Sequence, residues 1–416
     1  MPLFNFNNNP SFVAFRHINF RRFTFSKFML TLAQQIQFVV LSWQVYEITH
    51  DPLSLGLIGL AEAIPAVGLA LYGGYIADRS DRRTVLVRVI SLVFIVNCGL
   101  LAVSYYYTHG HALHSAWPFY LIMFLIGVLR SFYSPSQFSL MTRLVNREAY
   151  ANSSAWNSTF WHVGVVVGSA GGGLLLGLLG KNVSYGVVLF LILISLIQMM
   201  RIPKQEVVVS ALTETMRSSI REGLRFVFSN QPVFGAMTLD LVAVLFGGAV
   251  AMLPVFATDV LHVGASGFGL LRASPFVGSV IMALYMTKHP PLLNAGKKLM
   301  FCVTGFSVCM IVFALSKNFF LSMAILAISG AFDNVSVVIR ATIMQYLCPD
   351  EMRGRVSSVS SMFISSSNEI GAFESGFAAK IMGLIPSVIF GGVVASISVA
   401  AAAKWMPLLR KLQLKN

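Results

Sequence analysis

The stretch Gly73–Arg83, GGYIADRSDRR, lies between two long apolar segments of the chain, Leu53–Leu71 and Val85–Tyr107. It contains two aspartates and three arginines, which are too polar for the core of a lipid bilayer. The flanking segments are long enough to span a bilayer as helices. The stretch is therefore expected to be a water-exposed loop between two spans, and its arginines place it on the cytoplasmic side.

The composition as a whole is that of a protein embedded in lipid. Of its 416 residues, 56% are hydrophobic and only 11% are charged, which excludes an ordinary soluble domain. A bilayer core needs roughly 20 apolar residues per helix. Such stretches lie near 23–46, 53–77, 85–107, 117–140, 153–180, 183–202, 232–257, 266–287, 299–316, 319–345, 356–382 and 385–405. The sequence thus predicts an all-α membrane protein with twelve transmembrane helices.

Basic residues are distributed unevenly among the loops between these spans. The formal net charge is +14, and alternate loops contain nearly all of it, whereas the opposite loops contain little more than Lys181 and Lys317. Positively charged loops stay on the cytoplasmic side. We therefore expect a multi-pass protein of the inner cell membrane with both termini in the cytoplasm. Its basic surface would face anionic lipid, not nucleic acid, and the first span would be retained as an anchor.

The two halves of the chain resemble each other. With an offset of 203 residues, spans 4 and 5 match spans 10 and 11, and Gly127 matches Gly330. With an offset of 210, span 2 matches span 8, and Pro65 matches Pro275. We expect two pseudo-symmetric six-helix bundles, residues 1–202 and 232–416, joined by a cytoplasmic linker over 203–231 that contains an amphipathic helix. Such parallel halves place a substrate site between them and open it alternately to the two sides.

The spacing Gly74-x-x-x-Asp78-Arg79-x-x-Arg82-Arg83 resembles the signature between the second and third spans of the major facilitator superfamily of transporters, with Asp81 where a glycine is usual. The stretches at 43–49, 130–135, 144–152 and 345–356 resemble the branch that includes the enterobactin exporter and macrolide efflux proteins. The resemblance implies a conformational gate in which the loop meets the inner end of span 11. Its residues are Gly74, Asp78, Arg79, Arg82, Arg83, Arg353 and Arg355.

Asp78→Asn is expected to lower transport without preventing membrane insertion. The gate would lose the attraction between the carboxylate and the positive N-terminal end of span 11, about 1 kcal/mol. Transport normalised to protein level measures the effect. Unchanged transport would mean that the loop serves topology alone.

Small residues form a pattern in span 5. The glycines of Gly164-x-x-x-Gly168-Ser169-Ala170-Gly171-Gly172-Gly173 resemble a motif of antiporting drug exporters, with Ser169 in place of its proline. Gly164, Gly168, Gly172 and Gly173 would let two helices approach closely and slide. Static packing by small residues is the alternative.

Ionisable residues inside spans are costly and are candidates for function. The set comprises Glu62, Arg130, Asp240, Arg272, Asp333, Arg340, Glu369 and Glu374. Arg130 resembles an arginine that the superfamily links to coupling. The candidates for a proton carrier are Asp240, Glu369, Glu374 and His162, because a carboxylate or imidazole can exchange a proton. Each alternatively forms a structural ion pair or hydrogen bond, and Arg340 alternatively extends its charge to the membrane surface.

Spans 1, 4, 7 and 10 line the central cavity in this superfamily. The resemblance therefore implies that the substrate cavity contains Gln34, Gln35, Arg130, Asp240 and Asp333. Trp156 is added as an aromatic side chain that could stack on a substrate. Packing between helices, or a place at the membrane interface, is the alternative for such aromatics.

Other chemistries lack support in the sequence. The four cysteines have no metal-ligand spacing, and His109, His111 and His114 lack a carboxylate or cysteine nearby. No nucleotide-binding or hydrolase motif occurs. We expect no metal, no cofactor and no enzymatic activity.

The sequence as a whole favours a monomeric secondary transporter. The leading hypothesis is a proton-coupled exporter of a small amphipathic or siderophore-like compound, with protons and the lipid bilayer as its other partners. Uptake, or lipid transport of the lysophospholipid type, is the second hypothesis. A membrane-embedded enzyme or receptor is the third.

Overall fold

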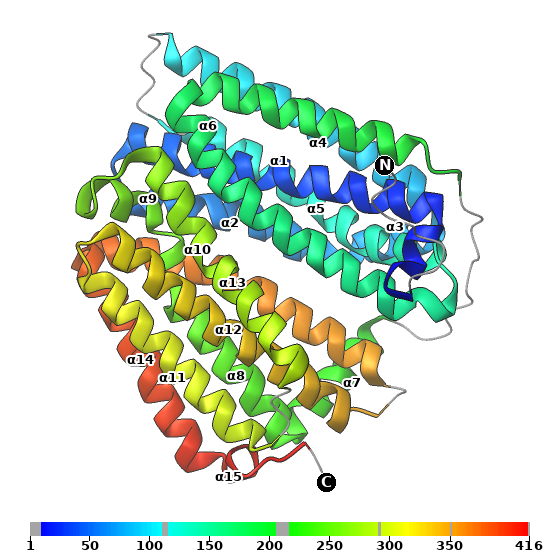
Figure 1. The fold of residues 1–416 in the computed structure, drawn as a ribbon, viewed down its shortest axis with the longest axis vertical. Coiled ribbons are helices and arrows are strands. Elements are labelled where there is room, and N and C mark those ends of the chain that lie inside the picture. Colours follow the sequence, from blue (N-terminus) through cyan, green and yellow to red (C-terminus); the bar gives the residue numbers. More distant parts are fainter. Residues whose placement is uncertain (1–9, 110–114, 205–215, 290–292, 350–351, 415–416) are drawn as a thin grey trace. The chain divides into compact units, whose positions relative to one another are not determined.

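The computed structural model describes residues 10–109, 115–204, 216–289, 293–349 and 352–414, and every regular element in these residues is a helix (Figure 1). By length and apolarity, seven of the described helices suffice to cross a membrane unaided. Other described helices are long enough to cross a membrane but are more polar, or they are interrupted within the membrane-length segment.

The first six predicted spans lie in the helices α1 to α6. In order, the elements are η1 (Pro10–Arg16), α1 (Ile18–Thr49), α2 (Pro52–Gly68), α3 (Ala70–Arg79), α4 (Arg82–Thr108), α5 (Trp117–Arg143), η2 (Arg147–Ala149) and α6 (Tyr150–Met200). The second span is α2 followed by α3. The fifth and sixth spans both lie in α6, which is broken at Gly180, where φ is +78°. Only glycine adopts this backbone conformation without strain, so Gly180 sets the boundary between the two spans.

The other six spans follow the linker. The elements are α7 (Met216–Ser229), α8 (Gln231–Phe246), η3 (Gly248–Val250), α9 (Leu253–Val255), the π-helix η4 (Phe256–Val260), α10 (Gly264–Lys288), α11 (Ala295–Leu315), α12 (Phe319–Leu347), α13 (Arg353–Met382), α14 (Leu384–Trp405) and α15 (Pro407–Arg410). The seventh span runs from α8 to η4, and α10 to α14 are the remaining five. Within the described residues, the helices match the twelve predicted spans to within a few residues.

Contacts between Cα atoms divide the chain into two compact units. The first is Met1–Thr49 with Ala61–Ser210, and the second is His50–Leu60 with Ala211–Asn416. The first turns of α2 thus belong to the second unit, because they pack closely on α13. A Cβ atom on Gly56 would lie 2.8 Å from Cα of Phe373, and Lys380 Nζ lies 2.6 Å from Asp51 Oδ2.

Each unit has the same pattern of neighbouring helices. In the first unit α4 packs on α5 and α6, α3 packs on α5, and α1 packs on α6. In the second unit α11 packs on α12 and α14, α10 packs on α12, and α8 packs on α13 and α14. Numbered by span, these are equivalent pairs. The pseudo-symmetry that the sequence repeat predicts is therefore visible within the separate units.

The matched glycines occupy equivalent crossings. A Cβ atom on Gly127 of α5 would clash with the Glu62 carbonyl and contact the ring of Pro65 on α2. A Cβ atom on Gly330 of α12 would clash with the carbonyl of Pro275 on α10. Glycine at these positions lets two helix backbones approach each other closely.

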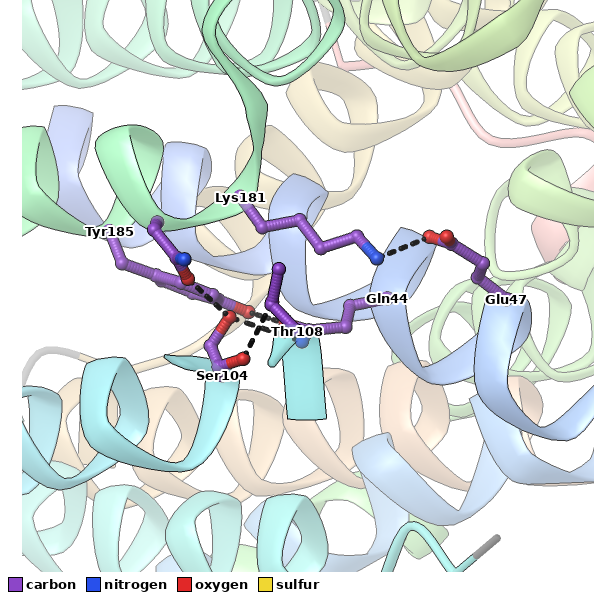
Figure 2. A network of polar contacts seen from close by, with 7 residues as sticks. Gln44, Glu47, Ser104, Thr108, Lys181 and Tyr185 are labelled. Atoms are coloured by element: carbon purple, nitrogen blue, oxygen red, sulfur yellow. Dashed lines mark hydrogen bonds and ion pairs between the residues drawn. The ribbon is translucent and has the colours of Figure 1, made fainter. Parts of the chain in front are cut away.

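A buried polar network joins three helices of the first unit (Figure 2). Gln44 on α1 donates from Nε2 to Ser104 Oγ on α4 at 3.1 Å, and its Oε1 accepts from the Tyr185 hydroxyl on α6 at 3.0 Å. Ser104 in turn donates to Asn182 Oδ1 at 3.2 Å. Beside this chain of bonds, Lys181 Nζ lies 2.8 Å from Glu47 Oε2. Because water does not enter a lipid core, buried polar groups of this kind must pair with one another.

Tyr185→Phe is expected to destabilise the first unit. The substitution keeps the ring but leaves Gln44 Oε1 without its donor, at a cost of about 1–3 kcal/mol. The thermal unfolding midpoint of the protein purified in detergent should fall. Tyr72→Phe is the matched control, because Tyr72 is 57% exposed; an equal shift in both variants would contradict a role for the network.

Candidate functional site

A buried ion pair joins α8 and α12 in the second unit. The carboxylate of Asp240 contacts Nη1 of Arg340, and the two side chains are only 7% and 11% exposed. Arg340 Nε also donates to the backbone carbonyl of Ser336, one turn earlier, at 3.3 Å. Of the two interpretations of Arg340, the alternative that it extends its charge to the membrane surface is the one that the ion pair contradicts. Its guanidinium has a partner inside the unit, 100 positions earlier in the sequence, and this attraction holds the charge inward.

The ion pair forms part of the wall of a cavity of about 570 Å³. The cavity is lined by residues of α8, α12 and α13 and lies entirely within the second unit. Its apolar wall includes Met237, Val337 and Phe363, and its polar wall includes Gln345 and Asn368. Pockets of this size accommodate drug-sized molecules. A mixed lining of this kind suits a ligand that is apolar over part of its surface and polar over the rest.

Asp333 lines the same cavity from α12, about two turns before Arg340. Its side chain is half-buried, and no described basic side chain forms an ion pair with it. Two of the predicted cavity residues, Asp240 and Asp333, therefore line one cavity. They differ in that only Asp240 has a cationic partner.

Arg130 lies in the first unit and forms its own ion pair. Its Nη1 lies 2.7 Å from Oε1 of Glu62, and the two side chains are 45% and 14% exposed. The pair joins α5 to α2 at the helix crossing where Gly127 packs on Pro65. This arrangement holds the guanidinium at a fixed place between two spans.

Glu369 on α13 faces two elements of the second unit. A Cβ atom on Gly59 of α2 would lie 3.1 Å from Glu369 Oε2, and Arg272 of α10 interacts electrostatically with this carboxylate. Glu374 lies further along α13, is half-buried and bonds the side chain of Ser375. Neither residue lines the 570 Å³ cavity.

The other predicted residues of the first unit lie in different surroundings. Trp156 stacks on Phe12 with ring centroids 5.1 Å apart, and it contacts Phe15 at the same distance. These contacts seat η1 on the start of α6. His162 is half-buried and meets the ring of Trp161 edge-on. Neither residue reaches the cavity of the second unit, so their predicted roles stay predictions.

The glycine pattern of span 5 faces α1. Cβ atoms on Gly164, Gly168 and Gly172 would lie 3.0 Å from Thr31 Cγ2, 2.8 Å from Gln35 Cβ and 3.0 Å from Ile36 Cα, respectively. Ser169 donates to Gln35 Oε1 at 3.4 Å. This face is packed closely and has one polar contact. Gln34 is exposed, and Gly173 is buried beside the other three glycines of the predicted motif.

The expectation of a loop over the whole of residues 73–83 is wrong, because residues 73–79 belong to α3 and Arg82 and Arg83 begin α4. The short turn between the two helices is fixed by the arginines on either side of it. Arg82 Nε donates to Ser139 Oγ on α5 at 2.6 Å, and Arg83 Nε donates to the carbonyl of Ile202, just after α6, at 2.9 Å. Arg79 donates to the Tyr75 hydroxyl and lies over its ring. Gly74 lies in α3 and is half-buried. The side chains of Asp78, Arg353 and Arg355, on which the predicted gate depends, lie outside the described residues.

Asp81 has a structural role that the sequence motif did not predict. It is the N-cap of α4, where its carboxylate accepts from the backbone N–H of Arg83 at 3.3 Å and of Thr84 at 3.2 Å. Aspartate is among the preferred N-cap residues. An aspartate directly before a long helix was the available signal, and it explains how the loop accommodates the change from glycine.

Comparison with known families and curated proteins gives consistent matches over nearly the whole chain. A family model described as transmembrane secretion effector matches residues 9–414. The enterobactin exporter EntS of Shigella flexneri is 24% identical over 90% of this chain and 88% of its own length. EntS of Citrobacter koseri is 23% identical over 90% and 89%, respectively.

Solved structures show the fold. The nucleoside transporter NupG superposes with a TM-score of 0.74 at 11% identity, covering 95% of this chain and all of its own. A bacterial homologue of the human lysosomal transporter Spinster, in an inward-facing and occupied conformation, gives 0.71 at 15% identity and covers 96% and 99%. These matches confirm the predicted fold class, twelve transmembrane helices in two six-helix bundles.

Proposed function

We propose that this chain, which belongs to the transmembrane secretion effector family of the major facilitator superfamily, exports a small amphipathic or siderophore-like compound in exchange for protons. The relatives and the similar structures are transporters, so the protein is a multi-pass transporter of the inner membrane and not an enzyme. Export, the substrate class and proton coupling are the proposal. In this proposal both termini lie in the cytoplasm, and the protein acts as a monomer.

The observation that carries this proposal is the cavity of about 570 Å³ with two carboxylates and one guanidinium on a largely apolar wall. Charged groups within spans are retained where they bind substrates or carry protons. Met237 and Met344 contribute flexible apolar surface, which adapts to ligands of different shape. A compound with hydroxyl donors on an apolar or aromatic body matches this lining. The similarity to an enterobactin exporter supports the same class.

Proton coupling follows if substrate and proton compete for one carboxylate. An ionised Asp333 can accept hydrogen bonds from substrate hydroxyl groups, whereas a protonated one offers a single weaker acceptor and a donor. Binding of a proton from the outside then favours release of the substrate there. Loss of the proton to the cytoplasm restores the substrate site. Alternating access of this one site gives antiport.

Asp240 fits a different role in the same cavity. A proton that binds Asp240 must compete with Arg340, which already neutralises the carboxylate. The pair can instead bind the substrate as a combined donor and acceptor. Glu369, whose carboxylate lies near Arg272, and Glu374 and His162 remain the other candidate proton carriers.

Inverted membrane vesicles with an imposed pH gradient, acidic inside, test the proposal. Vesicles that contain the protein should accumulate enterobactin above the level of vesicles without it, and an uncoupler should abolish the difference. Equilibration without a gradient would indicate facilitated diffusion, and accumulation with the gradient reversed would indicate uptake. Either result would contradict proton-driven export.

A further inference from the structure

A second cavity lies in the first unit, between η1, the start of α1 and α6. Its volume is about 370 Å³, and it is lined by Phe15, Arg21, Arg22, Thr24, Phe25, Phe160 and Gln198. It shares no residue with the cavity around Asp240. The lining combines two guanidinium groups, a hydroxyl, an amide and three aromatic rings, and it contains no carboxylate.

The charge of this cavity is uncompensated within the described part of the chain. No described acidic side chain forms an ion pair with Arg21 or Arg22. Arg22 uses Nη1 to donate to the backbone carbonyl of Arg201 at 2.7 Å, which leaves further N–H groups of its guanidinium for a ligand. Two guanidinium groups that line one cavity without an acid are a typical site for a phosphate group.

Thr24 gives an independent indication of a ligand. Its side chain is 2% exposed, it lines the cavity, and its Oγ1 has no hydrogen-bond partner among the described residues. A buried hydroxyl without a partner costs free energy. A ligand oxygen in the cavity would satisfy it, and Gln198 offers an amide donor in the same cavity.

We propose that this cavity binds an anionic phospholipid, with the phosphate held by Arg21 and Arg22 and the glycerol region by Thr24 and Gln198. The phenyl rings of Phe15, Phe160 and Phe25 would pack on the upper part of the acyl chains. Phe25 is 43% exposed, so the apolar wall continues onto the surface of the unit, where lipid tails lie. The two guanidinium groups would repel the ammonium group of a zwitterionic lipid, and this favours an anionic headgroup.

A lipid in this cavity would connect η1, the start of α1 and α6. Phe15 and Phe160 also belong to the aromatic cluster around Trp156, where their rings lie 5.1 and 5.9 Å from the tryptophan ring. Arg22 binds the carbonyl of Arg201, directly after α6. A bound lipid would therefore stabilise η1, the first turns of α1 and the end of α6 together.

Native mass spectrometry of the full chain in detergent, titrated with phosphatidylglycerol and with phosphatidylcholine of the same acyl chains, tests the proposal. Phosphatidylglycerol should bind about tenfold more tightly, because both lipids offer the phosphate but only phosphatidylcholine brings an ammonium group close to the two guanidinium groups. Arg21→Gln should lose most of this preference. Thr24→Val, which keeps the shape of the side chain, should weaken binding of phosphatidylglycerol about threefold or more.

Arg88→Gln is the matched control, because Arg88 is exposed on α4 and does not line the cavity. It removes the same charge and should leave the lipid preference unchanged. An equal loss in Arg88→Gln and Arg21→Gln would show non-specific attraction, and an equal affinity for the two lipids would exclude an anionic site. Displacement of the lipid by glycerol 3-phosphate would point to a soluble phosphate compound, and it would equally overturn the proposal.

Discussion

Gly330→Val is expected to lower the amount of folded protein in the membrane at least about tenfold, because its side chain would enter the backbone of α10. The carbonyl of Pro275 occupies the space that a Cβ atom on Gly330 needs, and the Ser279 hydroxyl donates to the Gly330 carbonyl at 2.8 Å. Backbone atoms cannot move aside as a flexible side chain can. Gly127→Val should have the same effect at the crossing of α5 and α2, where the Glu62 carbonyl lies against Gly127.

Gly99→Val is the control for both variants, because no atom lies within 4 Å of a Cβ atom built on Gly99 in α4. It introduces the same residue into a helix of the first unit and should leave the protein level near that of the unsubstituted chain. Quantitative immunoblotting of membranes and size-exclusion profiles in detergent measure the result. Normal levels of Gly330→Val would mean that α10 and α12 do not cross as closely as described.

Arg340→Gln is expected to abolish transport and to destabilise the second unit. The substitution leaves the Asp240 carboxylate, 7% exposed, without its cationic partner. Removal of one member of a buried ion pair costs about 3–5 kcal/mol. The thermal unfolding midpoint in detergent should therefore fall clearly, and substrate accumulation in vesicles should be lost.

The double variant Asp240→Asn with Arg340→Gln separates the two effects. It removes both charges of the pair, so much of the lost stability should return, whereas transport should stay impaired because the cavity has lost the ion pair that binds the substrate and retains only Asp333. Lys404→Gln, at an exposed position of α14, serves as the charge control. Full transport in the stable double variant would show that the pair is structural only.

The helices were predictable from the sequence because the length of a span is set by the bilayer, not by contacts with other parts of the chain. The break in α6 was also predictable, since Gly180 is followed by Lys181 and Asn182 between two apolar runs. The repeat predicted the crossings at Gly127 and Gly330. It did not predict that the first turns of α2 would pack on α13, because such packing depends on which small residues meet in space.

The candidate site was only partly predictable. Asp240 and Asp333 stood out because a carboxylate within an apolar segment is costly. The partner of Asp240 could not be predicted. Arg340 lies 100 positions away in the sequence and near the end of a span, where arginines often extend to the membrane surface. Two of the ring partners of Trp156 were not predictable, because Phe12 and Phe15 come from the segment before α1, far away in the sequence.

Proton release on addition of substrate, measured with a pH-sensitive dye in vesicles that contain the purified protein, tests the central claim most directly. In a second set of vesicles, loaded with enterobactin, addition of the same compound outside measures substrate exchange, which needs no net transport. We predict that the unsubstituted protein couples substrate entry to proton exit, and that Asp333→Asn retains substrate exchange but releases no protons. Proton release by Asp333→Asn at the rate of the unsubstituted protein would contradict the assignment of the coupling carboxylate. Substrate movement with no proton movement in either protein would contradict antiport itself.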